Sequence, residues 1–167
     1  MASVRLLGDA GVGKTAFLKR HTIGQFEARY IATESRSLAV CPFQTPTGRV
    51  VYSVWDCAGA EIDAPLDWAG TDALDWAGTD AFMVMFDLGS SLSYKNARWW
   101  IERVRAFSST APILLVGTKS ESRKLAPDQV TLHREFGIEY VEVSAKSDAK
   151  DAPFEWLQRV TGSGVSA

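Results

Sequence analysis

The segment that decides the fold of this chain is Gly8-Asp9-Ala10-Gly11-Val12-Gly13-Lys14-Thr15, which fits the pattern G-x-x-x-x-G-K-[ST]. An apolar run at 4–7 precedes it and a helical pattern follows, so the segment joins a predicted strand to a predicted helix. Glycines let backbone N–H groups converge on a phosphate, and a helix N-terminus adds partial positive charge. We therefore predict a phosphate-binding P-loop, in which Lys14 bridges the outer phosphates and Thr15 binds Mg²⁺. A glycine-rich turn that merely precedes a lysine is the disfavoured alternative.

Length and composition fit a single compact domain over residues 1–167, with hydrophobic residues at 46%. The formal net charge of -2 provides no general attraction to nucleic acid or to an anionic membrane. Cys41 and Cys57 are expected to be reduced thiols of an intracellular protein. No signal peptide, membrane-spanning run or terminal cysteine for prenylation is found in the sequence, so no membrane anchor is expected.

Strand and helix patterns alternate along the chain. This alternation predicts an α/β fold with a six-stranded, mostly parallel sheet and helices on both faces. Thr45-Pro46-Thr47-Gly48 reads as a hairpin turn, which adds one antiparallel edge strand. The predicted strands are 4–7, 38–43, 50–55, 82–86, 113–116 and 140–143. The predicted helices are 15–23, 92–107, 127–136 and 152–160.

One segment interrupts this order, because the octet at 66–73, Leu-Asp-Trp-Ala-Gly-Thr-Asp-Ala, is repeated without change at 74–81. The favoured explanation is a slippage duplication in a tolerant surface segment, since long loop insertions cost little closure entropy. A new binding surface with two equivalent tryptophans is the alternative. Each copy carries one tryptophan, Trp68 or Trp76. We expect one copy to pack on the protein through its tryptophan and the other copy to stay partly exposed.

Further polar residues follow the predicted strands at the edge where open α/β sheets bind ligands. Asp56 ends the second hairpin strand, where a carboxylate can hold Mg²⁺, and Gly59 can bring its N–H close to a γ-phosphate. The segments Thr118-Lys119-Ser120-Glu121 and Ser144-Ala145-Lys146 follow later strands. These placements predict one nucleotide site built from several loops.

These segments resemble the small GTPases of the Ras superfamily, and within it the Ran family of nuclear-transport GTPases. The similarity runs from about 4 to 157 and is interrupted mainly by the duplicated octet. It is carried by Lys19-Arg20-His21, Gly24-Gln25-Phe26-Glu27, Tyr30-Ile31-Ala32-Thr33, Trp55-Asp56, Met85-Phe86-Asp87, Tyr94-Lys95-Asn96 and Ser144-Ala145-Lys146-Ser147. The resemblance implies a Ras-like G domain that binds GTP or GDP with Mg²⁺.

The resemblance also assigns roles. Phe26 would pack edgewise on guanine, Tyr30 would lie over the phosphates, and Thr33 would ligate Mg²⁺ in the GTP state. Lys119 would run along the base and ribose, while the N–H of Ala145 would meet the guanine oxygen. A core aromatic at a helix end remains the alternative for Phe26. The expected nucleotide-binding set is Asp9, Ala10, Gly11, Val12, Gly13, Lys14, Thr15, Ala16, Phe26, Tyr30, Thr33, Gly59, Thr118, Lys119, Glu121, Ser144, Ala145 and Lys146. The expected metal ligands are Thr15, Thr33 and Asp56.

Four departures from the family pattern affect the chemistry. Ala60 replaces the glutamine that orients the attacking water, so no catalytic residue is predicted and hydrolysis should be slow. Ala10 replaces a P-loop glycine, which is weaker support for the same conclusion. Glu121 replaces the aspartate that accepts two hydrogen bonds from guanine, which puts guanine selectivity in question. Thr118 replaces an asparagine, as in Rho relatives.

Both switch regions also differ from the family. Glu34-Ser35-Arg36-Ser37 makes switch I polar, while 62–65 and the duplicated octet rewrite switch II. By resemblance the partners are nuclear transport receptors and Ran regulators, and the location is the nucleus and cytoplasm. In the Ran family a long, acid-ended tail favours the GDP-bound form. This sequence shows no such tail, so the GTP-bound form is expected to be favoured. The alternative function is a degenerate pseudo-GTPase that acts as a scaffold or competitor with weak or no nucleotide binding. An adenine-selective kinase is disfavoured by the residues at 118–119 and 144–146.

Overall fold

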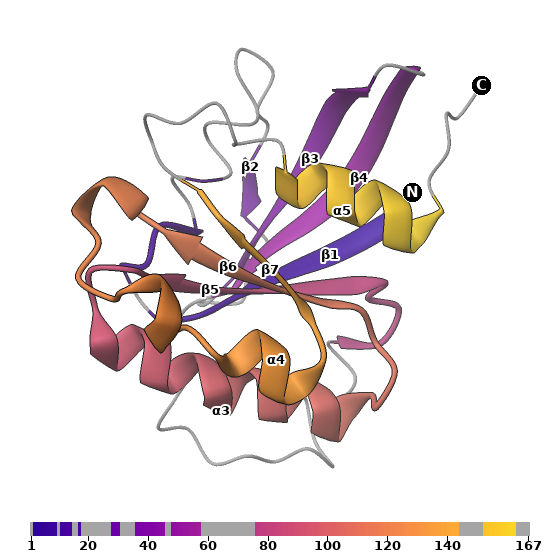
Figure 1. The fold of residues 1–167 in the computed structure, drawn as a ribbon. Helices are drawn as coiled ribbons and strands as arrows, with labels where there is room; N and C mark the ends of the chain where they lie inside the picture. Colours follow the sequence, from indigo (N-terminus) through magenta and orange to yellow (C-terminus); the bar gives the residue numbers. More distant parts are fainter. Residues whose placement is uncertain are drawn as a thin grey trace.

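The computed structural model describes residues 2–9, 11–14, 17, 28–30, 36–45, 48–57, 76–143 and 152–162. Within these ranges seven strands form one sheet, in the order β2-β3-β4-β1-β5-β6-β7 (Figure 1). The strands are β1 (Ala2–Leu7), β2 (Ala28–Tyr30), β3 (Arg36–Thr45), β4 (Gly48–Cys57), β5 (Ala81–Asp87), β6 (Ile113–Thr118) and β7 (Glu139–Glu142).

Five neighbouring strands, β4-β1-β5-β6-β7, run parallel to one another. The β3–β4 pair is the predicted hairpin, with Thr45 opposite Gly48. Parallel strands in the centre of such a sheet are buried on both faces, and all six apolar residues of β5 from Ala81 to Phe86 are buried. The α/β fold with a mostly parallel sheet is therefore confirmed.

The strand count and the sheet edge differ from the prediction of six strands with one antiparallel edge strand. A seventh strand, β2, pairs antiparallel with β3, so β3 is an inner strand. The sequence of β2 is Ala28-Arg29-Tyr30, which is too short and too polar to produce an apolar alternation. The strand forms because its backbone pairs with β3. Such pairing does not require an apolar pattern in the short segment itself, so the sequence does not reveal it.

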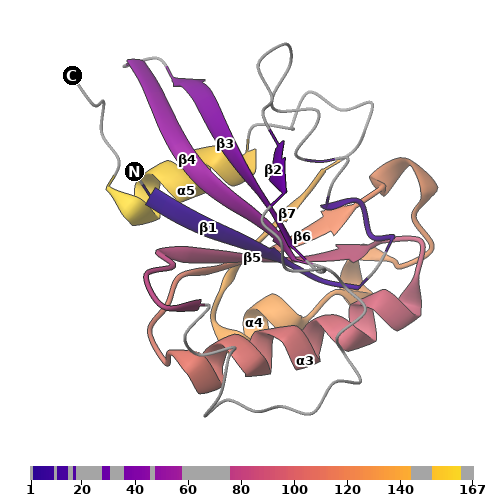
Figure 2. The same ribbon diagram turned by 180° about the vertical axis from the view of Figure 1, so that it is seen from behind.

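Helices lie on both faces of the sheet, as predicted (Figure 2). α3 (Ser91–Phe107) and α4 (Leu132–Phe136) cover one face, and α5 (Ala152–Thr161) covers the other. Side chains of β5 divide between two cores, because Phe82 and Val84 pack toward α3 while Met83 packs toward α5. No helix in the described part of the chain is both long and apolar enough to cross a bilayer.

The predicted helix at 127–136 is divided into two short helices. A 3-10 helix η3 (Pro127–Gln129) is followed by an extended residue, Val130, and then by α4. The Tyr94 hydroxyl accepts hydrogen bonds from the backbone N–H groups of Thr131 and Leu132 at 2.8 and 3.1 Å. This tertiary contact satisfies donors at the start of α4 that a continuous helix would use internally.

The second copy of the duplicated octet is built into the fold. The Trp76 ring is buried against the rings of Phe82 and Phe107, with centroids 5.2 and 5.7 Å away. Thr79 Oγ1 accepts a hydrogen bond from Arg5 Nε, and the Asp80 carboxylate accepts one from the N–H of Ser3. The expectation that one copy packs on the protein is therefore met by the second copy. The first copy, including Trp68, lies outside the described residues.

Candidate functional site

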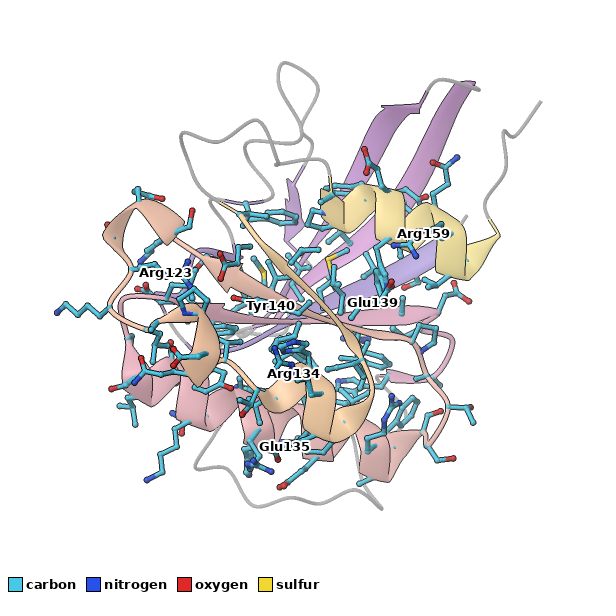
Figure 3. All side chains as sticks on the ribbon, in the orientation of Figure 1. Arg123, Arg134, Glu135, Glu139, Tyr140 and Arg159 are labelled. Carbon is cyan, nitrogen blue, oxygen red and sulfur yellow. The ribbon has the colours of Figure 1, made fainter. Side chains whose placement is uncertain are left out.

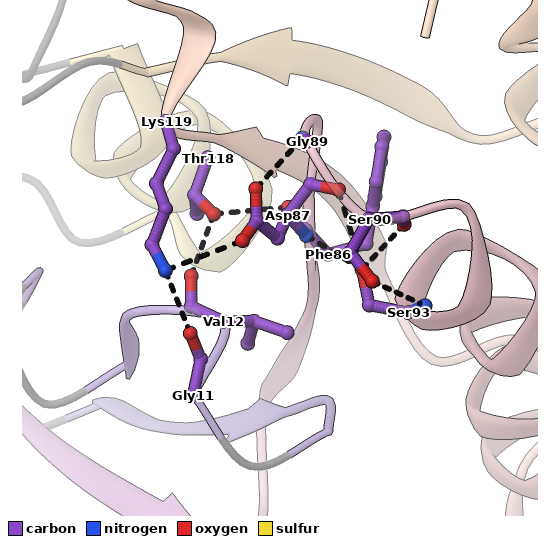
Figure 4. A network of polar contacts seen from close by, with 9 residues as sticks. All are labelled: Gly11, Val12, Phe86, Asp87, Gly89, Ser90, Ser93, Thr118 and Lys119. Carbon is purple, nitrogen blue, oxygen red and sulfur yellow. Dashed lines mark hydrogen bonds and ion pairs between the residues drawn. The ribbon is translucent and has the colours of Figure 1, made fainter. Parts of the chain in front are cut away.

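The site lies at the carboxyl ends of β1, β5 and β6, where three loops meet. The loop after β1 contains Gly11 and Val12, Asp87 ends β5, and Thr118 and Lys119 lie at the end of β6 (Figure 4). Because parallel strands end at the same edge of the sheet, residues more than a hundred positions apart in sequence become neighbours there.

The backbone of the P-loop requires glycine where it leaves β1. Gly8 has a φ of +145°, and a Cβ atom there would overlap the carbonyl oxygen of Met85 in β5. Gly13 has a φ of +102°, a conformation that side chains with a Cβ rarely adopt. The described residues of the predicted P-loop therefore have the tightly curled backbone that phosphate binding requires.

Lys14 is held inside the curl of this loop. Its side chain is buried, and Nζ donates to the carbonyl oxygens of Gly8 and Asp9 at 2.8 and 2.9 Å. A buried ammonium group is costly unless its donors are satisfied, and carbonyl dipoles stabilise it without neutralising its charge. This arrangement fits the predicted role of Lys14 on the outer phosphates of a nucleotide.

Thr118 connects β6 to the P-loop. Its hydroxyl oxygen lies 2.6 Å from the carbonyl oxygen of Val12 and 3.0 Å from that of Phe86. The single hydroxyl hydrogen serves one of these acceptors at a time, so Thr118 bonds either the phosphate loop or β5. A threonine can therefore connect residues 118–121, the predicted base-recognition loop, to the P-loop at this position.

Lys119 makes a second connection between the same loops. It has a left-handed backbone, with a φ of 57°, and its Nζ donates to the carbonyl oxygen of Gly11 at 2.8 Å. Nζ also lies 3.2 Å from Oδ2 of Asp87, whose Oδ1 accepts a hydrogen bond from the N–H of Gly89 at 2.7 Å. The lysine stem therefore spans from the base-recognition loop to the P-loop, next to the predicted position of the base and ribose.

Sequence reasoning missed the structural role of Asp87. In the sequence, Asp87 stands out only as part of the family phrase Met85-Phe86-Asp87. Its position at the end of a buried strand was the available signal, because a lone carboxylate there needs a cationic partner. Lys119 is that partner.

Side chains of β7 hold the segment that follows the base-recognition loop. Arg123 donates through both terminal nitrogens to the Glu142 carboxylate at 3.0 and 2.8 Å, and Tyr140 Oη donates to the same carboxylate at 2.6 Å. Arg123 and Tyr140 are labelled in Figure 3. Burial alone would raise the pKa of Glu142, but the hydrogen bonds from Arg123 and Tyr140 outweigh it and lower that pKa below its ordinary value. Burial, and then the hydrogen bond to Glu142, raise the pKa of Tyr140.

Glu121 lies in the 3-10 helix η2 (Ser120–Ser122), which directly follows Lys119. The residue is exposed. The position is therefore compatible with a carboxylate that reaches a base, although the glutamate places that carboxylate one methylene further from the backbone than the aspartate usual in the family.

Other predicted site residues are described in part or not at all. Of Asp56 and Tyr30 the backbone is described: Asp56 pairs with Leu6 beside the start of the P-loop, and Tyr30 pairs with Ser37. The remaining predicted residues lie outside the described ranges, and these are Ala10, Thr15, Ala16, Phe26, Thr33, Gly59, Ala60, Ser144, Ala145 and Lys146. Two of the three predicted metal ligands, Thr15 and Thr33, are in this group, so their roles stay predictions.

The fold and the loop geometry define a P-loop nucleotide-binding protein. The family model described as "Ras: Ras family" matches residues 3–160, which is nearly the whole chain. The chain therefore belongs to the Ras family, and it is a GTP-binding small GTPase of the switch type. Members of this family bind GTP and GDP generally with Mg²⁺, and they bind regulators.

Proposed function

We propose that this chain is a Ran-like guanine-nucleotide switch that hydrolyses GTP slowly and acts mainly as a GTP-held binding module for nuclear transport receptors. The observation that carries nucleotide binding is the junction of the two loops, where Lys119 Nζ donates to Gly11 O at 2.8 Å while Lys14 is held in the P-loop. The Ran-like role is supported by the sequence phrases around Tyr30 and Tyr94. A nuclear and cytoplasmic location is part of the same proposal.

Slow hydrolysis is supported by Ala60, at the position where the family has glutamine. An alanine methyl group can neither orient the attacking water nor contact the transition state. The charge-stabilising parts of the site, such as Lys14, hold the nucleotide in the ground state as well. Binding is therefore retained while the chemical step loses a necessary group.

The first experiment is analysis of the nucleotide released from protein that is purified without added nucleotide. Stoichiometric GTP supports the proposal, because a bound triphosphate would have survived purification. An empty site would instead support the pseudo-GTPase alternative, which is motivated by Glu121 in place of the family aspartate and by the altered switch regions.

The second experiment is single-turnover hydrolysis of GTP by the unaltered protein and by Ala60→Gln. We expect the substitution to raise the rate, because glutamine restores an amide that can position the water. An ordinary small-GTPase rate in the unaltered protein would contradict the proposal. Binding to a purified nuclear transport receptor in the presence of GTP, and not of GDP, tests the Ran-like role separately.

A further inference from the structure

The P-loop is attached to α3 through the side chain of Asp9. Asn96 Nδ2 donates to Asp9 Oδ2 at 2.6 Å, and Trp100 Nε1 lies 3.3 Å from Asp9 Oδ1. A carboxylate can only accept hydrogen bonds, so each oxygen receives a different donor. Asn96 and Trp100 are four residues apart, which places them on one face of the helix.

The two donors are themselves fixed in place. Trp100 is only 3% exposed, and its ring packs edge-on against Trp99 with centroids 4.8 Å apart. Asn96 is partly buried in the middle of a 17-residue helix that Ser90 caps at its N-terminus. The contact therefore joins the P-loop to a rigid element, whereas a contact from an exposed loop would leave Asp9 free to move.

The same residue, Asp9, also contacts the phosphate-binding lysine. Its carbonyl oxygen accepts a hydrogen bond from Lys14 Nζ at 2.9 Å, next to the Gly8 carbonyl oxygen at 2.8 Å. Because the carboxylate is held, the Asp9 backbone can rotate less. The carbonyl group of Asp9 therefore keeps the direction in which it accepts from Lys14. One residue thus connects α3 to the position of the Lys14 ammonium.

We propose that Asn96 and Trp100 are positioning residues for phosphate binding, which act through Asp9 to hold Lys14 where the outer phosphates of a nucleotide bind. The proposal rests on the guanine-nucleotide binding of the proposed function. A P-loop lysine reaches the β- and γ-phosphates, while backbone N–H groups serve the phosphates closer to the ribose. Disturbing Asp9 should therefore lower the affinity for ligands that carry an outer phosphate. The affinity for ligands that lack one should stay unchanged.

The experiment compares the affinities of GDP and GMP, in the presence of Mg²⁺, for the unaltered protein and for Asn96→Asp. This substitution keeps the shape of the side chain but replaces a donor by an acceptor and sets two carboxylates against each other. We expect the Kd for GDP to rise about tenfold or more, since a hydrogen bond to a charged group is lost. We expect the Kd for GMP to stay within about twofold, because GMP carries no outer phosphate for Lys14.

Two further variants support the comparison. Asn96→Ala removes the donor without adding a charge, and Trp100→Phe removes the indole N–H but keeps an aromatic ring; both should shift the GDP affinity in the same direction. Arg98→Gln is the matched control, because Arg98 lies on the same helix but pairs with Glu135 on the surface. It should leave both affinities unchanged.

Equal losses of GDP and GMP affinity in Asn96→Asp and Asn96→Ala would overturn the inference, since a general loosening of the fold affects both ligands alike. Unchanged GDP affinity in both variants would overturn it too. In either case the unaltered protein still binds GDP, so the proposed function stands. Failure of the unaltered protein to bind GDP would overturn the inference and the proposed function together.

Discussion

At the scale of the residue, Gly8 shows how closely the P-loop is fitted to its neighbours. Its φ of +145° and the carbonyl oxygen of Met85 both exclude a side chain. The motif predicts a glycine here for the approach of a phosphate, but the structure adds a second reason, which is the close approach of β5.

We predict that Gly8→Ala lowers the free energy of unfolding by about 2–4 kcal/mol, because backbone strain and overlap with Met85 act together. Chemical denaturation measures the change. Gly137→Ala is the control, since Gly137 also has a positive φ, of 63°, but nothing lies near its Cβ position. Its cost should be about 1–2 kcal/mol, from the left-handed backbone alone. Equal costs at the two positions would show that the contact with Met85 is unimportant.

Thr118 illustrates a substitution whose effect the sequence left open. A family asparagine is replaced, yet the hydroxyl lies within hydrogen-bond distance of Val12 O and Phe86 O. The short side chain suffices because the carbonyl groups of two neighbouring segments approach it. Thr118 can therefore bond to the P-loop despite its short side chain.

At the scale of the element, β7 supports the base-recognition loop through Glu142. The hydrogen bonds from Arg123 and Tyr140 hold the pKa of Glu142 below its ordinary value. The ionised carboxylate thus stabilises the folded state at pH values above the ordinary carboxyl pKa. This stabilisation is lost as the pH falls through the lowered, folded-state pKa.

We predict that Glu142→Gln reduces the loss of unfolding free energy between neutral and acidic pH, because glutamine does not take up the proton. Denaturation curves at a series of pH values measure this slope. Glu139→Gln is the control on the same strand, since its partner Arg159 is exposed and exposed ion pairs contribute little (Figure 3). The same slope in Glu142→Gln and in the unaltered protein would contradict a role for this carboxylate in acid sensitivity.

The second octet is the other element whose role the structure clarifies. Trp76 is 6% exposed and packs between Phe82 and Phe107. We predict that Trp76→Ala lowers the free energy of unfolding by about 3–5 kcal/mol, the usual cost of removing a large core aromatic. Urea denaturation measures it.

Trp68→Ala makes the matching change in the first octet. We expect a smaller loss of stability, because Trp76 of the second copy already fills the core position against Phe82 and Phe107. A loss as large as that of Trp76→Ala would contradict the slippage explanation, since it would show that the first copy also packs in the protein.

At the scale of the whole molecule, the nucleotide site joins elements that are far apart in the chain. Gly11 lies in the first loop and Lys119 follows the sixth strand, yet their atoms are 2.8 Å apart. A ligand that spans these loops binds the folded state and not the unfolded chain, and it therefore stabilises the whole domain.

We predict that GDP with Mg²⁺, at about 100 times its Kd, adds roughly 2.7 kcal/mol to the free energy of unfolding. The Tm should then rise by roughly 5–10 °C for a domain of this size. Differential scanning calorimetry measures the shift, and chelation of the metal should reverse part of it. ADP is the control ligand. An equal shift with ADP would contradict guanine selectivity, and no shift with GDP would favour the pseudo-GTPase alternative.

The sequence by itself determined the alternation of strands and helices, the P-loop glycines and the family, because these depend on short-range patterns: glycine spacing, apolar runs and the lysine at position 14. The helix predicted at 15–23 lies, apart from Phe17, outside the described residues. Only the tertiary structure decided the pairing of β2, the division of the helix at 127–136 and the contact of Asp9 with Asn96 and Trp100. Each of these depends on groups that are distant in sequence and meet through the packing of the sheet. A local pattern cannot specify such a contact, since its partner is chosen by the fold.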